Sequence, residues 1–69
     1  MDRNKVGGAI AYLRKRAGYT QKDLADRIGV SDKAVSKWET GRGYPDISLI
    51  EPLAGALGVS IIELFPART

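Results

Sequence analysis

The amino-acid sequence predicts an all-α fold, a compact bundle of five short helices. Three observations favour it. Apolar residues recur at three- and four-residue spacing in five separate segments, no segment shows the alternation of a β-strand, and the connections are about two to six residues long. A chain of 69 residues with 43% hydrophobic residues can bury one small core. We therefore expect residues 1–69 to form a single domain, with a core from about residue 6 to residue 65.

The first helix is expected from about Lys5 to Ala17. Its buried stripe, at helical spacing, contains Val6, Ile10, Leu13 and Ala17. Gly7 and Gly8 weaken the first turn, each by roughly 1 kcal/mol relative to alanine. Gly18 ends the helix, because glycine enters left-handed backbone conformations without steric cost.

A second helix begins at Gln21, and the side chain of Thr20 can cap it. Asp23 lies in its first turn, where a negative charge complements the helix dipole. Leu24 and Ile28 are four residues apart, so they share one face of this helix.

A tight turn at Gly29 leads into a third helix, from Asp32 to about Glu39, and Ser31 offers a hydroxyl to cap it. Val35 and Trp38 are three residues apart, so they share the buried face of this helix. The two helices and their turn are expected to bury Leu24, Ala25, Ile28, Val30, Val35 and Trp38.

Residues 41–45 are rich in glycine and proline and form a turn before a fourth helix. Either Asp46 or Ser48 caps this helix. Ser48 with Glu51 forms an S-x-x-E capping box, and a start at Ser48 also brings Pro52 nearer the first turn. Both observations favour the later start. The buried stripe of the helix contains Leu49, Leu53, Ala56 and Leu57.

Gly58 ends the fourth helix, and Ser60 caps a short fifth helix that stops before Pro66. The apolar residues that complete the core are Ile61, Leu64 and Phe65. Ile62 is out of phase with these three, so we expect it to be exposed and regard it as a candidate for weak self-association.

The composition argues against several kinds of protein. The chain has no cysteine and no histidine, so we expect no disulfide, no metal and no cofactor. The acidic residues are scattered at no catalytic spacing, which argues against an enzyme. No apolar run approaches the roughly 18 residues of a membrane span, so we expect a cytoplasmic protein with no membrane contact. The net charge is +3, and residues 1–20 hold five basic residues against one acidic residue, which suits a side that faces a polyanion.

Two motifs follow one another in the chain, the stretch TQKDLADRIGVSDKAVSKWETG and the Leu-Gly-Val-Ser link into the fifth helix. In this order they resemble the phage repressor and Cro-like helix-turn-helix family, also called XRE-like, over about residues 6–65. The resemblance implies a lambda-repressor-like fold in which the second and third helices form the helix-turn-helix. It also implies a sequence-specific transcriptional regulator of a prokaryote or phage, and in particular a repressor, that binds double-stranded DNA.

In this family the exposed first turns of the third helix supply the residues that face the major groove. The resemblance implies this role for Asp32, Lys33, Ala34, Ser36 and Lys37. Lysine donates to guanine O6 or N7, an alanine methyl can touch a thymine methyl, and aspartate can accept from a cytosine amino group. Two alternatives stay open, since Asp32 also helps to cap the helix and lysines on an exposed helix face are usually just solvated.

The resemblance further implies phosphate contacts by Gln21, at the start of the second helix, and by Arg42, in the glycine-rich loop. It implies an ion pair between Arg14 and Glu39 that ties the first helix to the end of the third. The angle between the second and third helices depends on small or buried residues, here Ala25, Gly29 and Trp38.

The expected partner is double-stranded DNA with a pseudo-palindromic operator, bound by two copies whose third helices lie about 34 Å apart. The fifth helix is expected to supply a weak homodimer contact. The alternative is an antitoxin or another protein-interaction module built on the same fold. A purely structural bundle does not explain why two lysines and a glutamine occupy the outward positions of the motif.

Overall fold

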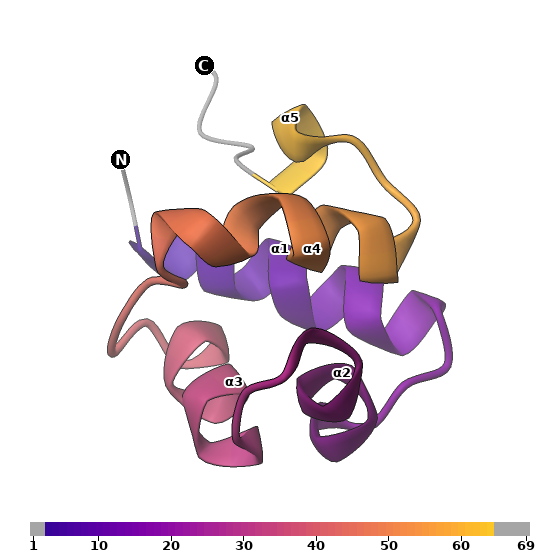
Figure 1. Ribbon diagram of the computed structural model, residues 1–69. Coiled ribbons are helices and arrows are strands. Elements are labelled where there is room, and N and C mark those ends of the chain that lie inside the picture. Colours follow the sequence, from indigo (N-terminus) through magenta and orange to yellow (C-terminus); the bar gives the residue numbers. More distant parts are fainter. Residues whose placement is uncertain (1–2, 65–69) are drawn as a thin grey trace.

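The computed structural model describes residues 3–64, and this part of the chain forms five α-helices and no strand (Figure 1). The helices are α1 (Arg3–Arg16), α2 (Gln21–Ile28), α3 (Asp32–Glu39), α4 (Ile47–Leu57) and α5 (Ile61–Leu64). In Figure 1, α2 and α3 lie on one side of α1 and α4, and α5 lies on the opposite side. The all-α, five-helix fold that the sequence predicts is confirmed. None of these helices is long and apolar enough to cross a bilayer.

Every helix contributes to one core. The buried apolar residues are Val6, Ile10 and Leu13 of α1, Leu24 and Ala25 of α2, Val35 and Trp38 of α3, Leu53, Ala54 and Leu57 of α4, and Leu64 of α5. Burial of one large aliphatic side chain contributes about 1.5–3 kcal/mol. Helices this short are marginal alone, so the shared core holds them together. Ile28 and Val30, both expected in the core, are half-buried at its edge.

Gly7 lies where α1 crosses the end of α3. A side chain at residue 7 would collide with the backbone carbonyl oxygen of Trp38, and its Cβ would lie 3.0 Å from the carbonyl oxygen of Glu39. The two helices come this close because residue 7 has no side chain. From the sequence alone Gly7 is only a weak point of the helix, whereas in the structure α1 continues through it to Arg3.

The end of α1 differs from the prediction. Ala17, expected in the buried stripe, is exposed and follows the last residue of the helix, Arg16. Gly18 has a φ of +83°, and the N–H of Tyr19 donates to the carbonyl of Arg14 at 3.1 Å. This turn reverses the chain and carries Ala17 away from the core.

Of the two possible caps of α4, the structure selects Asp46, so the preference for the later start at Ser48 is wrong. Asp46 is the N-cap, and its Oδ2 accepts hydrogen bonds from the backbone N–H of Ser48 at 3.0 Å and from the Ser48 hydroxyl at 2.6 Å. The Ser48 hydroxyl is thus a donor to the cap rather than a cap itself. Pro52 consequently lies inside α4. Ala54, absent from the predicted stripe, is buried, and Ala56 is half-buried.

α5 buries Leu64 and exposes its other residues. Ile61 is 44% exposed, so its predicted place in the core is wrong, and Ile62 is 77% exposed, as its phase predicts. A helix of a single turn can present only one such residue to the core. The N–H of Ser60 donates to Oε1 of Glu63 at 3.2 Å, which holds the start of the helix. Phe65, the third predicted core residue, lies outside the described residues.

Candidate nucleic-acid interface

The turn between α2 and α3 is built on Gly29. This residue has a φ of +76°, and the N–H groups of Gly29 and of Val30 both donate to the carbonyl of Ala25. Glycine adopts that backbone conformation without the steric cost that a Cβ imposes. The hydroxyl of Ser31 then accepts the N–H of Ala34 at 3.1 Å and starts α3. The turn and the cap therefore fix how α3 follows α2, and Ala25 of α2 is buried.

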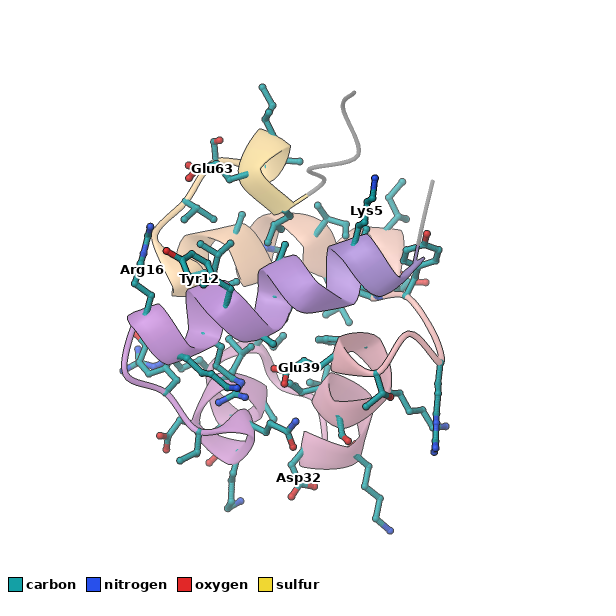
Figure 2. All side chains as sticks on the ribbon, turned by 180° about the vertical axis from the view of Figure 1, so that it is seen from behind. Lys5, Tyr12, Arg16, Asp32, Glu39 and Glu63 are labelled. Atoms are coloured by element: carbon teal, nitrogen blue, oxygen red, sulfur yellow. The ribbon has the colours of Figure 1, made fainter. Side chains whose placement is uncertain are left out.

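α3 has one buried face and one open face. Val35 and Trp38 are buried, with 0% and 5% of their surfaces exposed. The five residues predicted to face DNA lie on the rest of the helix: Asp32, Lys33 and Lys37 are exposed, and Ala34 and Ser36 are half-buried. Figure 2 shows Asp32 at the end of α3 that lies away from α1. The fold thus gathers these residues on one accessible surface, and their contact with DNA stays a prediction.

The loop after α3 holds Arg42 close to the last turn of that helix. Gly41 has a φ of +77°, and the N–H of Arg42 donates to the carbonyl of Lys37 at 2.9 Å. The Thr40 hydroxyl donates to the carbonyl of Ser36 at 2.9 Å. Arg42 is exposed, and it brings a second cation to the end of α3 that carries Lys37. A cation in this position also complements the negative end of the helix dipole.

The N-terminus of α2 carries a capping box. The Thr20 hydroxyl accepts the N–H of Asp23 at 3.0 Å, and Oδ2 of Asp23 accepts the N–H of Thr20 at 2.9 Å. The backbone N–H of Thr20 stabilises the carboxylate of Asp23, and the Thr20 side chain adds to this, so the pKa of Asp23 is lowered below its usual 3.8. The first amides of an α-helix have no acceptor inside the helix, so those of Gln21 and Lys22 have no intrahelical partner, and the phosphate contact of Gln21 stays a prediction.

Arg14 and Glu39 form the ion pair that the resemblance implies. Arg14 Nε donates to Glu39 Oε2 at 2.6 Å and Nη2 donates to Oε1 at 3.0 Å, while Nη1 donates to the carbonyl of Tyr19 at 2.7 Å. The Arg14 residue is only 8% exposed. The hydrogen bond to Glu39 raises the pKa of Arg14, burial opposes this rise, and the charge of Glu39 adds to it. The pair joins α1 to the end of α3.

Gln21 joins the same group, which the sequence did not indicate. Its Nε2 donates to Oε1 of Glu39 at 3.0 Å, and its side chain is half-buried. The two residues are 18 positions apart on different helices, so no local spacing reveals the contact. The predicted phosphate ligand and the predicted ion pair are therefore parts of one hydrogen-bonded cluster.

The outward face of α2 contains a second contact that sequence patterns do not predict. The guanidinium of Arg27 lies 4.4 Å from the centre of the Tyr19 ring, as in a cation–π pair. Lys22 and Asp26, one turn apart on this helix, form an exposed ion pair at 3.6 Å, which contributes little in water. These contacts occupy Arg27 and Lys22 within the protein.

Known protein sequences resemble this chain over most of its length. The family described as Helix-turn-helix matches residues 10–64 of the chain. The chain is 43% identical over 65 residues to the uncharacterized HTH-type transcriptional regulator y4dJ of Sinorhizobium fredii, covering 93% of this chain and 84% of that protein. It is 38% identical over 60 residues to the cryptic phage CTXphi transcriptional repressor RstR of Vibrio cholerae, covering 87% of this chain and 54% of RstR. The chain thus spans about half the length of the second relative.

Solved structures agree with the sequence relatives. The restriction-modification controller protein C.AhdI from Aeromonas hydrophila superposes with a TM-score of 0.87 at 33% identity, over 93% of this chain and 97% of that one. PlcR from Bacillus thuringiensis, solved with the peptide PapR7 and DNA, superposes with a TM-score of 0.82 at 32% identity, over 90% of this chain and 22% of PlcR. The resemblance seen in the sequence is confirmed. The chain belongs to the helix-turn-helix family.

Proposed function

We propose that this chain is a transcriptional regulator that binds double-stranded DNA sequence-specifically and reads the major groove with α3. One observation carries the proposal. α3 buries Val35 and Trp38 and turns Asp32, Lys33 and Lys37 outward on one surface. A helix with a buried stripe for orientation and an open polar face has the form that the major groove admits.

The base contacts would come from the first turns of α3. Lys33 and Lys37 are one helical turn apart, and their ammonium groups suit guanine O6 or N7. Ala34 offers a methyl to thymine, Ser36 offers a hydroxyl that donates or accepts, and Asp32 suits a cytosine amino group. These groups would bind and orient the DNA, and we propose no catalytic role for any of them.

Two flanking groups would place α3 on the duplex without reading bases. Gln21 and the open amides at the start of α2 suit one phosphate. Exposed Arg42, in the loop next to the last turn of α3, suits another. Phosphate contacts of this kind fix the register of a recognition helix in the groove.

A repressor needs only to occupy its operator, and the proposed interface around α3 would do this. The similarity to RstR, which is named as a phage transcriptional repressor, supports this choice. We propose that residues 1–69 act as one DNA-binding domain and that the protein works in the cytoplasm, where its DNA target lies.

The proposed homodimer uses α5, which lies on the side of the molecule away from α2 and α3 (Figure 1). Ile61 and Ile62 are exposed there. Beside them a groove of about 390 Å³ is lined by Ala9, Tyr12, Leu13, Arg16 and Glu63. Figure 2 shows the last of these residues and two from α1, Tyr12 and Arg16, on the same side of the molecule. Exposed apolar residues around a groove support a weak contact between two copies on a pseudo-palindromic operator.

Selection of bound sites from a random double-stranded DNA library tests the proposal. We expect enrichment of a palindromic sequence with half-sites one helical turn apart, which would establish DNA reading and dimer geometry together. The matched control is the double variant Lys33→Ala/Lys37→Ala, which should enrich no such sequence. Absence of enrichment by the unaltered protein would contradict the proposal and favour the alternative, an antitoxin or another protein-interaction module.

A further inference from the structure

Glu39 lies between three helices. Its carboxylate accepts Nε and Nη2 of Arg14 from α1 and Nε2 of Gln21 from the start of α2. Figure 2 shows Glu39 pointing from α3 towards α1 and α2. The Arg14 guanidinium is in turn fixed by its bond to the Tyr19 carbonyl, at 2.7 Å. Arg14 therefore fixes both oxygens of the carboxylate, and one of them, Oε1, also accepts the hydrogen bond from Gln21.

The chemistry of the Gln21 contact fixes which end of the amide faces Glu39. A carboxylate only accepts hydrogen bonds, so the partner must be the amide nitrogen and not the amide oxygen. That nitrogen carries two hydrogens, and the bond to Glu39 Oε1 uses one of them. The other hydrogen remains a donor on a side chain whose position is already set. Gln21 is also the first residue of α2, beside the open amides of that helix.

A negative carboxylate next to a phosphate site is unfavourable unless it is neutralised. The bidentate bond from Arg14, whose side chain is almost fully buried, supplies this compensation and keeps the carboxylate from turning towards the DNA. The Arg14–Glu39 pair that holds Gln21 thus carries no net charge.

We propose that Glu39 is a positioning residue for DNA binding: it fixes the Gln21 amide so that the free Nε2–H is ready to donate to a DNA phosphate. The inference rests on the proposed function and goes beyond it, because the Arg14–Glu39 ion pair would then position a DNA-binding side chain in addition to joining α1 to α3. The contact is assembled before DNA arrives, so the Gln21 side chain loses little conformational freedom on binding.

A purely electrostatic role and a purely structural role for Glu39 predict different results from the positioning role. Glu39→Gln removes a negative charge near the DNA, so charge alone predicts tighter binding and positioning predicts weaker binding. Glu39→Asp keeps the charge and withdraws the carboxylate by one methylene, so charge alone predicts no change. A purely structural role predicts that substitution of Glu39 lowers the amount of folded, active protein equally with and without the Gln21 side chain.

The test is a double-mutant cycle for binding to the selected DNA site. It uses the full chain as unaltered protein, Glu39→Asp, Gln21→Ala and the double variant, with active protein determined by stoichiometric titration. Glu39→Asp should weaken binding about three- to tenfold, the range for one hydrogen bond. In the Gln21→Ala background the same change should alter affinity by less than about twofold, because the positioned group is gone. Glu39→Gln should follow the same pattern although it removes a negative charge.

Three outcomes would overturn the inference. One is unchanged affinity of Glu39→Asp, the second is an equal loss in both Gln21 backgrounds, and the third is tighter binding by Glu39→Gln. A failure of the proposed function is recognised separately, because the unaltered protein would then show no preferred site, and the positioning role would fall with it.

A second measurement needs no DNA. Gln21 is the only glutamine in the chain, so its side-chain amide signals in a ¹H–¹⁵N spectrum can be assigned by their disappearance in Gln21→Ala. We expect one of its two amide protons to be shifted downfield and slow to exchange, and both properties to be lost in Glu39→Asp. Two equivalent, rapidly exchanging protons in the unaltered protein would contradict the inference.

Discussion

Gly7 of α1 packs directly against the backbone carbonyl of Trp38 in α3, at a point where no side chain fits. Gly8, its neighbour, has no atom of another element within 4 Å of the place where a Cβ would be. The two adjacent glycines therefore have different roles, although the sequence alone predicts only that each weakens the helix.

This difference predicts opposite signs for the same substitution. Gly7→Ala should lower the free energy of unfolding by about 1–3 kcal/mol, because the added methyl meets backbone that cannot rotate away. Gly8→Ala should raise it by up to about 1 kcal/mol, because alanine favours the helix and nothing opposes it. Urea unfolding followed by circular dichroism measures both values, and a stabilised Gly7→Ala variant would contradict the packing described.

Lys37→Ala tests base reading by α3. The variant should lose about 1–3 kcal/mol of binding free energy at the selected site and much less on random DNA, because a base contact contributes only at the correct sequence. The measurement is a fluorescence titration with both DNA types at one salt concentration. Lys5→Ala is the matched control, since exposed Lys5 points away from α2 and α3 in Figure 2. Equal losses on both DNA types would make Lys37 a phosphate contact.

Arg42→Ala tests the loop after α3. If Arg42 contacts a phosphate, the variant should bind all DNA more weakly, and the slope of log K against log salt should decrease by about 1. Titrations at four or more salt concentrations give this slope. Lys5→Ala removes the same charge elsewhere and should leave the slope nearly unchanged. An Arg42→Ala slope equal to that of the unaltered protein would count against the loop contact.

The cap of α4 predicts a dependence of stability on pH. The Ser48 hydroxyl, and then its backbone N–H, donate to Asp46 and lower the pKa of this carboxyl below its usual 3.8. The unfolded chain therefore binds the proton more readily, so the cap stabilises the fold above about pH 4 and this stabilisation is lost as the pH falls further. We expect Asp46→Asn and Ser48→Ala to flatten the fall in Tm between about pH 5 and 2.5. The same slope in all three proteins would contradict the assignment.

Ile62→Glu tests self-association through α5. A charge in place of an exposed isoleucine at the contact between two copies should increase the dimer dissociation constant at least about tenfold, because a buried unpaired carboxylate is costly. Sedimentation equilibrium gives the constant. Ile47, at the start of α4, is 88% exposed, and Ile47→Glu provides the control for a general effect of charge. A similar change in both variants would place the contact elsewhere.

The sequence predicts α2 and α3 to within one residue because each helix carries its own boundary signals. Thr20 and Ser31 cap the two starts, and Gly29 ends the first of them in a conformation that favours glycine. Local rules decide such boundaries because the deciding hydrogen bonds span only three or four residues. The start of α4 is ambiguous in the sequence because Asp46 and Ser48, two residues apart, are both good caps, and the structure shows that Asp46 is the one that accepts.

The candidate site is less predictable than the fold. The outward position of Lys33 and Lys37 follows from their phase relative to Val35 and Trp38. The bond from Gln21 to Glu39 depends on how α2 and α3 are placed in space, and no pattern within either helix encodes it. The close packing of Gly7 against α3 likewise depends on how the two helices are placed in space, so the sequence of α1 alone does not predict it.

α5 lies on the side of the molecule away from α3 (Figure 1). Two copies paired through α5 would leave both reading helices free, so pairing and operator binding would support each other. With weak pairing, occupancy of a two-copy operator rises as the square of the protein concentration, so threefold more protein fills a sparsely occupied site about ninefold more by mass action. A gene controlled in this way would respond to a threshold in the abundance of the protein.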